Sequence, residues 1–168
     1  MRISILTLAF FLGLNIHSQE RSNTKSLLRE VNNKDVIQSV FPTAIRVDKV
    51  DKYWYKIVDA TGKIVGFAMS SQRFCDAVIG YSDHTPVLII TDLKFIIRKV
   101  ALLSNSESPG YVRRLERNGF FNLWNDKTVK KAKNVEIDGY TGATLTARAV
   151  EKNVKFLLEN GSKKMPRK

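Results

Sequence analysis

Two strand-turn-strand patterns in the middle of the 168-residue chain constrain its fold more than any other feature. Each joins two extended runs through a short turn: 52–59 to 64–68 through Thr61-Gly62-Lys63, and 87–91 to 95–103 through Asp92-Leu93-Lys94. Runs rich in β-branched and aromatic residues around such turns are typical of β-hairpins. A loop at 75–86 separates the two pairs. The sequence therefore predicts an antiparallel sheet built from two hairpins.

Helical patterns flank these strands. Residues 25–32 and 34–41 have helical spacing, and Asn33 is predicted to open the second of these helices. A charged helical stretch follows the 104–110 loop. From Leu145 onward the chain reads as an amphipathic helix, with these apolar positions: Val150, Val154, Leu157 and Leu158. The predicted class is α+β, an antiparallel sheet with flanking helices and a C-terminal helix.

The first 18 residues have a different character. Arg2 precedes an uncharged apolar run from Ile3 to Leu14, and Ser18 follows. This run is shorter than the roughly 20 residues that span a bilayer, and the pattern is typical of a secretory signal peptide. Ile16 and His17 form a poor cleavage context, so a retained anchor stays as an alternative. We expect an exported protein, periplasmic or membrane-peripheral on the outer face of the cytoplasmic membrane.

One domain is expected to follow this segment, because 43% hydrophobic content suffices for a core at this length. The expected division is a signal peptide at 1–18, an N-terminal helical or extended segment at 19–52, the main domain at 53–160 and a basic tail at 161–168.

The composition excludes several function classes. The net charge is +12, but the basic residues are dispersed and end in a tail, 163–168, that is predicted to be solvated and disordered. No nucleic-acid-binding motif accompanies this charge, so we expect no nucleic-acid partner. Cys75 is the single cysteine and is predicted to be buried in the core. With only His17 and His84 besides, we expect no metal site, and a hydrolytic triad would depend on His84 alone.

The stretch from Asp138 to Thr146, DGYTGATLT, places an acid, two glycines and three hydroxyls just before the C-terminal helix. Backbone N–H groups and the helix dipole favour an anion there. Gly142 and Ala143 have little side-chain bulk, so a phosphate or a planar ring could approach the backbone closely. Threonine and glycine before a helix are also ordinary N-capping residues, and this alternative stays open.

The same stretch resembles the flavinylation motif of the FMN-binding domain family, in which the final threonine carries FMN through a phosphodiester bond. On this resemblance Thr144 is the acceptor, and Asp138 is read by the modifying enzyme. Three other segments follow the family order: 62–67, the loop at 80–86, and 107–110, where the family commonly has E-T-P-G. Asp83-His84 replaces the usual glycine pattern, and Ser108 replaces threonine.

The resemblance extends from about Tyr53 to about Leu158. It implies an α+β sheet with the flavin at one edge, and a 107–110 loop that faces the isoalloxazine or the ribityl chain opposite Thr144. The residues implied to bind FMN are Tyr81, Glu107, Ser108, Pro109, Gly110, Thr141, Gly142, Ala143, Thr144, Leu145 and Thr146. None is catalytic. Taken alone, Ser-Pro-Gly is also a common turn, and an aromatic residue such as Tyr81 beside a hairpin is commonly part of the core.

The function implied is electron transfer rather than stand-alone enzyme activity. The family includes peripheral FMN subunits of sodium-pumping quinone reductases and related ion-translocating complexes, and sensory domains of nitrous-oxide regulators. A separate magnesium-dependent flavin transferase attaches the flavin, with FAD as donor. The expected partner is a membrane electron-transfer protein, with iron–sulfur clusters as one option. The alternatives are a noncovalent flavin or small-ligand sensor with the same fold, and a structural or adhesion protein without flavin.

Overall fold

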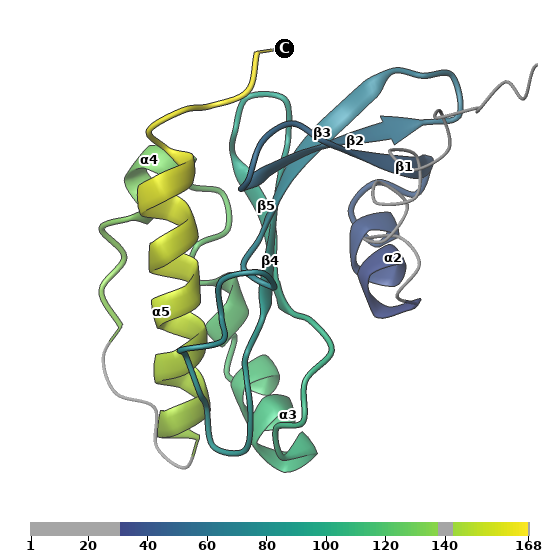
Figure 1. Cartoon of the computed structure of the whole chain (residues 1–168). Coiled ribbons are helices and arrows are strands. Elements are labelled where there is room, and N and C mark those ends of the chain that lie inside the picture. Colours follow the sequence, from purple (N-terminus) through teal and green to yellow (C-terminus); the bar gives the residue numbers. More distant parts are fainter. Residues whose placement is uncertain (1–30, 138–142, 168) are drawn as a thin grey trace, which may run out of the picture.

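The computed structural model describes residues 31–137 and 143–167 (Figure 1). A short helix, α2 (Val31–Gln38), precedes the sheet. The strands are β1 (Ala44–Lys49), β2 (Trp54–Asp59), β3 (Ile64–Ser70), β4 (Val87–Thr91) and β5 (Ile97–Leu102). The later helices are α3 (Pro109–Arg117), the 3₁₀ turn η1 (Phe120–Asn122), α4 (Val129–Ala132) and α5 (Thr144–Gly161). The predicted α+β class is confirmed.

The sheet is a five-stranded antiparallel meander in the order β1-β2-β3-β4-β5. Both predicted hairpins are present, as β2–β3 and β4–β5, with Trp54 opposite Met69 and Ile89 opposite Val100. The connection at 71–86 brings the two hairpins side by side. Strand β1 was not predicted. Its exposed charged residues and its bulge after Ala44 weaken the alternating pattern, as is common for edge strands.

The sheet separates two apolar clusters. Successive side chains of a strand point to opposite faces, so Trp54 and Met69 pack towards α5 while Tyr55 and Ala68 pack on the other side, with α2. Figure 1 shows α5 and α2 on opposite sides of the strands. Strand β4 is buried at every position because both of its faces are covered. The larger cluster fixes α5, and with it the start of that helix.

The prediction for the first helices was wrong at Asn33. Helix α2 runs through Asn33, which is fully buried, and the helix does not begin there. Packing of this helix against the sheet therefore outweighs the preference of asparagine for a helix start. Residues 25–30, and the predicted signal peptide, lie outside the described residues.

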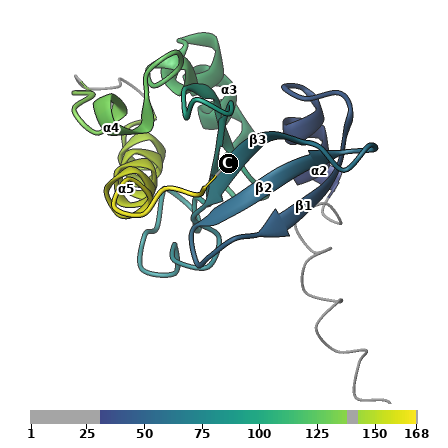
Figure 2. The ribbon, with the colours of Figure 1, turned by 90° about the horizontal axis from the view of Figure 1, so that it is seen from above.

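The basic tail lies against the protein. Lys163 and Lys164 are exposed, but Pro166 is buried and Met165 packs on the main cluster, so the prediction of a solvated, disordered tail was wrong for these two residues. Figure 2 shows the chain crossing from the end of α5 towards the sheet. Apolar residues among the lysines explain this path, because they gain free energy when they are buried.

Within 31–137 and 143–167, no helix combines the length and the apolar character that crossing a membrane requires.

Candidate functional site

The carboxylate of Glu107 joins three segments that are far apart in the sequence. Its Oε2 atom accepts hydrogen bonds from the backbone N–H of Tyr81, at 3.1 Å, and from the hydroxyl of Thr146 in α5. Its Oε1 atom accepts hydrogen bonds from the backbone N–H groups of Ser82, at 2.9 Å, and Asp83, at 3.1 Å. One side chain therefore connects the 80–86 loop, the segment before α3 and the first turn of α5.

Glu107 is buried and ionised. Its exposed fraction is 5%. Burial raises the pKa of this carboxyl, but the hydrogen bonds from Thr146, Ser82, Asp83 and Tyr81 outweigh that effect and hold the pKa below its ordinary value. A buried carboxylate is tolerated when such hydrogen bonds replace its hydration. At neutral pH the site therefore contains a fixed negative charge beneath the loop.

The 80–86 loop closes tightly over this carboxylate. A Cβ atom at Gly80 would lie 2.5 Å from Oε1 of Glu107 and 2.8 Å from Cγ2 of Thr85, so the position requires glycine. The N–H of Gly80 donates to the carbonyl of Asp83 at 2.8 Å, and the Asp83 carboxylate accepts from the N–H of His84 at 2.7 Å. The Asp83-His84 departure from the family pattern is thus accommodated in the closed loop.

Helix α5 holds the same loop at a second point. The side-chain amide of Asn153 donates to the carbonyl of Thr85 at 2.9 Å and to the hydroxyl of Thr85 at 3.2 Å, and these groups are buried. Asn153 lies seven residues after Thr146, which places it about 10 Å further along the helix. The two attachments hold the loop against the first three turns of α5.

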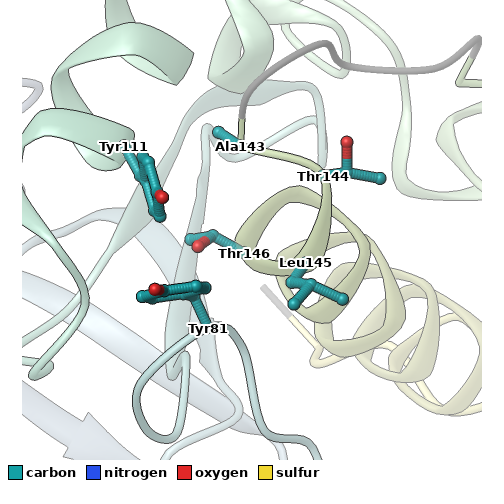
Figure 3. A pocket seen from close by; sticks show the side chains of 6 residues that line it. All are labelled: Tyr81, Tyr111, Ala143, Thr144, Leu145 and Thr146. Atoms are coloured by element: carbon teal, nitrogen blue, oxygen red, sulfur yellow. The ribbon is translucent and has the colours of Figure 1, made fainter.

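A cavity of about 200 Å³ opens where the loop meets the helix (Figure 3). Its lining residues are Tyr81, Tyr111, Ala143, Thr144, Leu145 and Thr146. The rings of Tyr81 and Tyr111 meet edge to face, with centroids 4.9 Å apart and planes at 85°. Tyr81 and Leu145 stay 57% and 54% exposed, so an apolar surface continues outside the cavity. Small-molecule sites commonly measure about 300 Å³ or more, so this cavity suits one part of a larger ligand.

The start of α5 forms one wall of this cavity. The helix begins at Thr144, one residue before the predicted start, and its N-cap, Ala143, provides no side-chain cap. The predicted position of the Thr144 and Thr146 hydroxyls at the helix start is confirmed. The first N–H groups of a helix lack intrahelical partners, and its dipole favours an anion there. Together with the two tyrosine rings, this end of the helix fits a ligand that has both a phosphate group and a planar ring.

The structure brings together many of the candidate residues but not all of them. Tyr81, Ala143, Thr144, Leu145 and Thr146 line the cavity, and Glu107 lies directly beneath it. Asp138, Thr141 and Gly142 lie outside the described residues.

Residues 108–110 are not among the residues that line the cavity. Ser108 is the N-cap of α3 and Pro109 begins that helix, and among the described residues it is Tyr111, shortly after them in the chain, that reaches the cavity. Tyr111 and Asn153 were not among the site residues predicted from the sequence. The only signal for Tyr111 was its position directly after Pro109-Gly110.

The remaining reactive side chains do not extend this site. Cys75 is buried, and burial raises the pKa of its thiol. Within the part of the chain that the structure describes, no three His, Cys, Asp or Glu side chains gather in a way that could hold a metal ion.

Comparison with known proteins gives the class of this site. Residues 80–159 match the FMN-binding domain family, and this segment contains the 80–86 loop, Glu107 and most of α5. The resemblance inferred from the motifs is therefore confirmed: the segment belongs to the FMN-binding domain family, and FMN is its cofactor.

Two individual proteins are similar to the chain. One is a component of the ion-translocating oxidoreductase complex of Photorhabdus laumondii subsp. laumondii, which is 26% identical over 182 residues, 92% of this chain and 87% of that protein. The other is NqrC of Shewanella oneidensis, whose crystal structure aligns with a TM-score of 0.42 and 17% identity over 73% of each chain.

Proposed function

We propose that this chain is an exported electron-transfer protein that carries FMN covalently on Thr144. When bound, FMN supplies the redox chemistry, and the protein supplies attachment, orientation and electrostatics. The observation that carries the proposal is the position of Thr144, which is the first residue of α5 and belongs to the lining of the cavity. Its side chain points away from the rings of Tyr81 and Tyr111, on the open side of the helix start (Figure 3).

Of the threonines in the 138–146 motif, the structure describes Thr144 and Thr146, and their surroundings favour Thr144 as the acceptor. Thr146 is fully buried and its hydroxyl donates to Glu107, whereas Thr144 is only partly buried. Two residues correspond to about 200° around a helix, so these side chains point to nearly opposite sides, as Figure 3 illustrates. A modifying enzyme could reach Thr144 without breaking the contacts of Thr146.

With FAD as donor, the attachment reaction transfers the FMN moiety to Thr144 and releases AMP. Thr144 would lose its hydroxyl proton to the solvent and gain a bond from Oγ to the phosphorus of the FMN moiety, while the phosphoanhydride bond of FAD breaks and AMP leaves. The product is a phosphodiester monoanion next to the start of an 18-residue helix. The helix dipole stabilises such an anion by about 0.3–1 kcal/mol when it is exposed. A flavin transferase is the partner for this step.

The proposed redox partner is a membrane electron-transfer protein, with iron–sulfur clusters as one option. The name of the Photorhabdus protein, which places it in an ion-translocating oxidoreductase complex, supports a role in such an assembly. The apolar run before residue 18 supports export, to the periplasm or the outer face of the cytoplasmic membrane. The net charge of +12 would favour docking on acidic groups or anionic lipid headgroups.

Denaturation of protein coexpressed with a flavin transferase tests the covalent link. We expect yellow colour and the mass of one attached FMN to remain in the unfolded chain. Both should disappear in Thr144→Ala and be retained, at least partly, in Thr144→Ser, which keeps a hydroxyl. Covalent flavin in Thr144→Ala would contradict the assignment. Flavin released on unfolding would favour a noncovalent sensor module, and a colourless product would favour a structural or adhesion role.

A further inference from the structure

We propose that Glu107 is a positioning residue for flavin attachment, which holds the two walls of the cavity together and does not itself contact FMN. This inference rests on the proposed attachment of FMN to Thr144. It assigns to Glu107 a role different from that of a direct flavin ligand.

The hydrogen-bonding capacity of Glu107 is already used. An ionised carboxylate accepts about four hydrogen bonds and donates none. Four donors of the protein occupy it: the N–H groups of Tyr81, Ser82 and Asp83, and the hydroxyl of Thr146. The carboxylate therefore has no lone pair left for the ring N–H or the ribityl hydroxyls of a flavin. Its negative charge would also repel the flavin phosphate.

A single oxygen atom sets the spacing of the cavity walls. Oε2 of Glu107 accepts both from the backbone N–H of Tyr81 and from the side-chain hydroxyl of Thr146. Both residues line the cavity, Tyr81 from the 80–86 loop and Thr146 from α5. Thr146 lies in the same helical turn as Thr144. The position of the acceptor relative to the Tyr81 ring is thus fixed through one buried carboxylate.

Replacement by glutamine would disrupt this arrangement while keeping the size of the side chain. An amide NH₂ group would replace one oxygen. In the place of Oε1 it would face the N–H groups of Ser82 and Asp83, and in the place of Oε2 it would face the N–H of Tyr81, while the Thr146 hydroxyl could rotate to accept from it. In either orientation at least one hydrogen bond would be lost, and the others would no longer involve a charged group. We expect this loss to appear mainly as misplacement of the first turn of α5, because apolar packing holds the rest of the helix.

The test measures the rate of FMN attachment by a purified flavin transferase, with FAD and Mg²⁺, alongside the thermal midpoint of each unmodified variant. Glu107→Gln and Thr146→Val should each attach FMN at least tenfold more slowly. A tenfold decrease corresponds to a rise of about 1.4 kcal/mol in the activation free energy of attachment. Thr146→Ser keeps the hydroxyl and should restore a rate within about threefold of the unsubstituted protein. Trp54→Phe, which is destabilised at the far end of α5, should attach FMN at an almost unchanged rate.

Two results would overturn the inference. One is attachment to Glu107→Gln and Thr146→Val at the rate of the unsubstituted protein. The other is a rate that falls with the thermal midpoint in all variants, Trp54→Phe included, because this would show a general effect of stability. If the unsubstituted protein itself accepts no covalent flavin, the proposed function fails, and the inference fails with it. If the unsubstituted protein is modified and the two variants react at the same rate, only the inference fails, so the two failures are distinguishable.

Discussion

The two ends of α5 are held in different ways. At its start, Thr146 donates to the buried Glu107 carboxylate, and near its middle Asn153 donates to the 80–86 loop. At its end, Gly161 packs so closely on the sheet that a Cβ atom there would lie 2.3 Å from Sδ of Met69, and its carbonyl accepts from the indole N–H of Trp54 at 3.0 Å. The first end is polar and the second is mostly apolar.

This difference separates stability from orientation. Apolar burial is non-directional and roughly proportional to area, so the packing at Gly161 stabilises the helix without demanding a particular geometry of the site. Hydrogen bonds contribute less in net free energy, but they are directional. A buried donor or acceptor that is left without its partner also lowers stability. Directional hydrogen bonds therefore orient the end of α5 that bears Thr144, whereas apolar packing stabilises the other end.

The largest expected effect on stability is at the apolar end. Gly161→Val would force a branched side chain against Met69 and the rigid ring of Trp54, so the free energy of unfolding should fall by about 3 kcal/mol. Urea titration measures this loss. Gly110→Ala serves as a control, because outside the chain neighbours and the helix backbone the nearest atom to the added Cβ is Oγ of Ser108, at 3.9 Å, and its effect should stay within about 1 kcal/mol. Equal losses in both variants would contradict the close packing at Gly161.

A smaller, pH-dependent effect is expected at the polar end. The folded pKa of Glu107 lies below its ordinary value of 4.5, so its contribution to stability is fully present above about pH 4.5 and is lost as the pH falls through the lower folded value. Glu107→Gln should lower the free energy of unfolding by about 2 kcal/mol at pH 7. The difference from the unsubstituted protein should shrink below pH 4.5.

Urea titration from pH 7 to pH 3 checks this prediction. Because both proteins share the other acidic groups, the difference isolates Glu107. The same substitution at exposed Glu116 serves as a control and should change the free energy of unfolding only slightly. A constant difference between Glu107→Gln and the unsubstituted protein over the whole range would argue against an ionised, hydrogen-bonded Glu107.

The smallest expected effect on stability is at the cavity itself. Tyr81→Ala removes the edge-to-face contact with Tyr111, but the ring is largely exposed, so the loss should be about 0.5 kcal/mol. The visible absorption spectrum of the attached FMN should nevertheless shift, because one cavity wall changes. Ile45→Ala, an exposed apolar residue on β1, should leave the spectrum unchanged. A Tyr81 variant with an unaltered spectrum would place the flavin elsewhere.

Local sequence signals predicted much of the fold but little of the contact pattern. The turns at 61–63 and 92–94 identified both hairpins, and the apolar spacing after Leu145 identified α5. Strand β1 was missed because charged residues dominate its exposed positions. The role of Glu107 was not predictable locally, because its partners lie 24 to 39 residues away in the sequence and meet only after the sheet and α5 pack together.

The most direct test of the account is the identity of the modified residue. Protein coexpressed with a flavin transferase would be unfolded, digested and mapped by tandem mass spectrometry across the peptide that contains Thr141, Thr144 and Thr146. We predict the mass of one FMN on Thr144 alone. FMN on Thr141 or on Thr146, or a flavin-bearing peptide from another part of the chain, would contradict it.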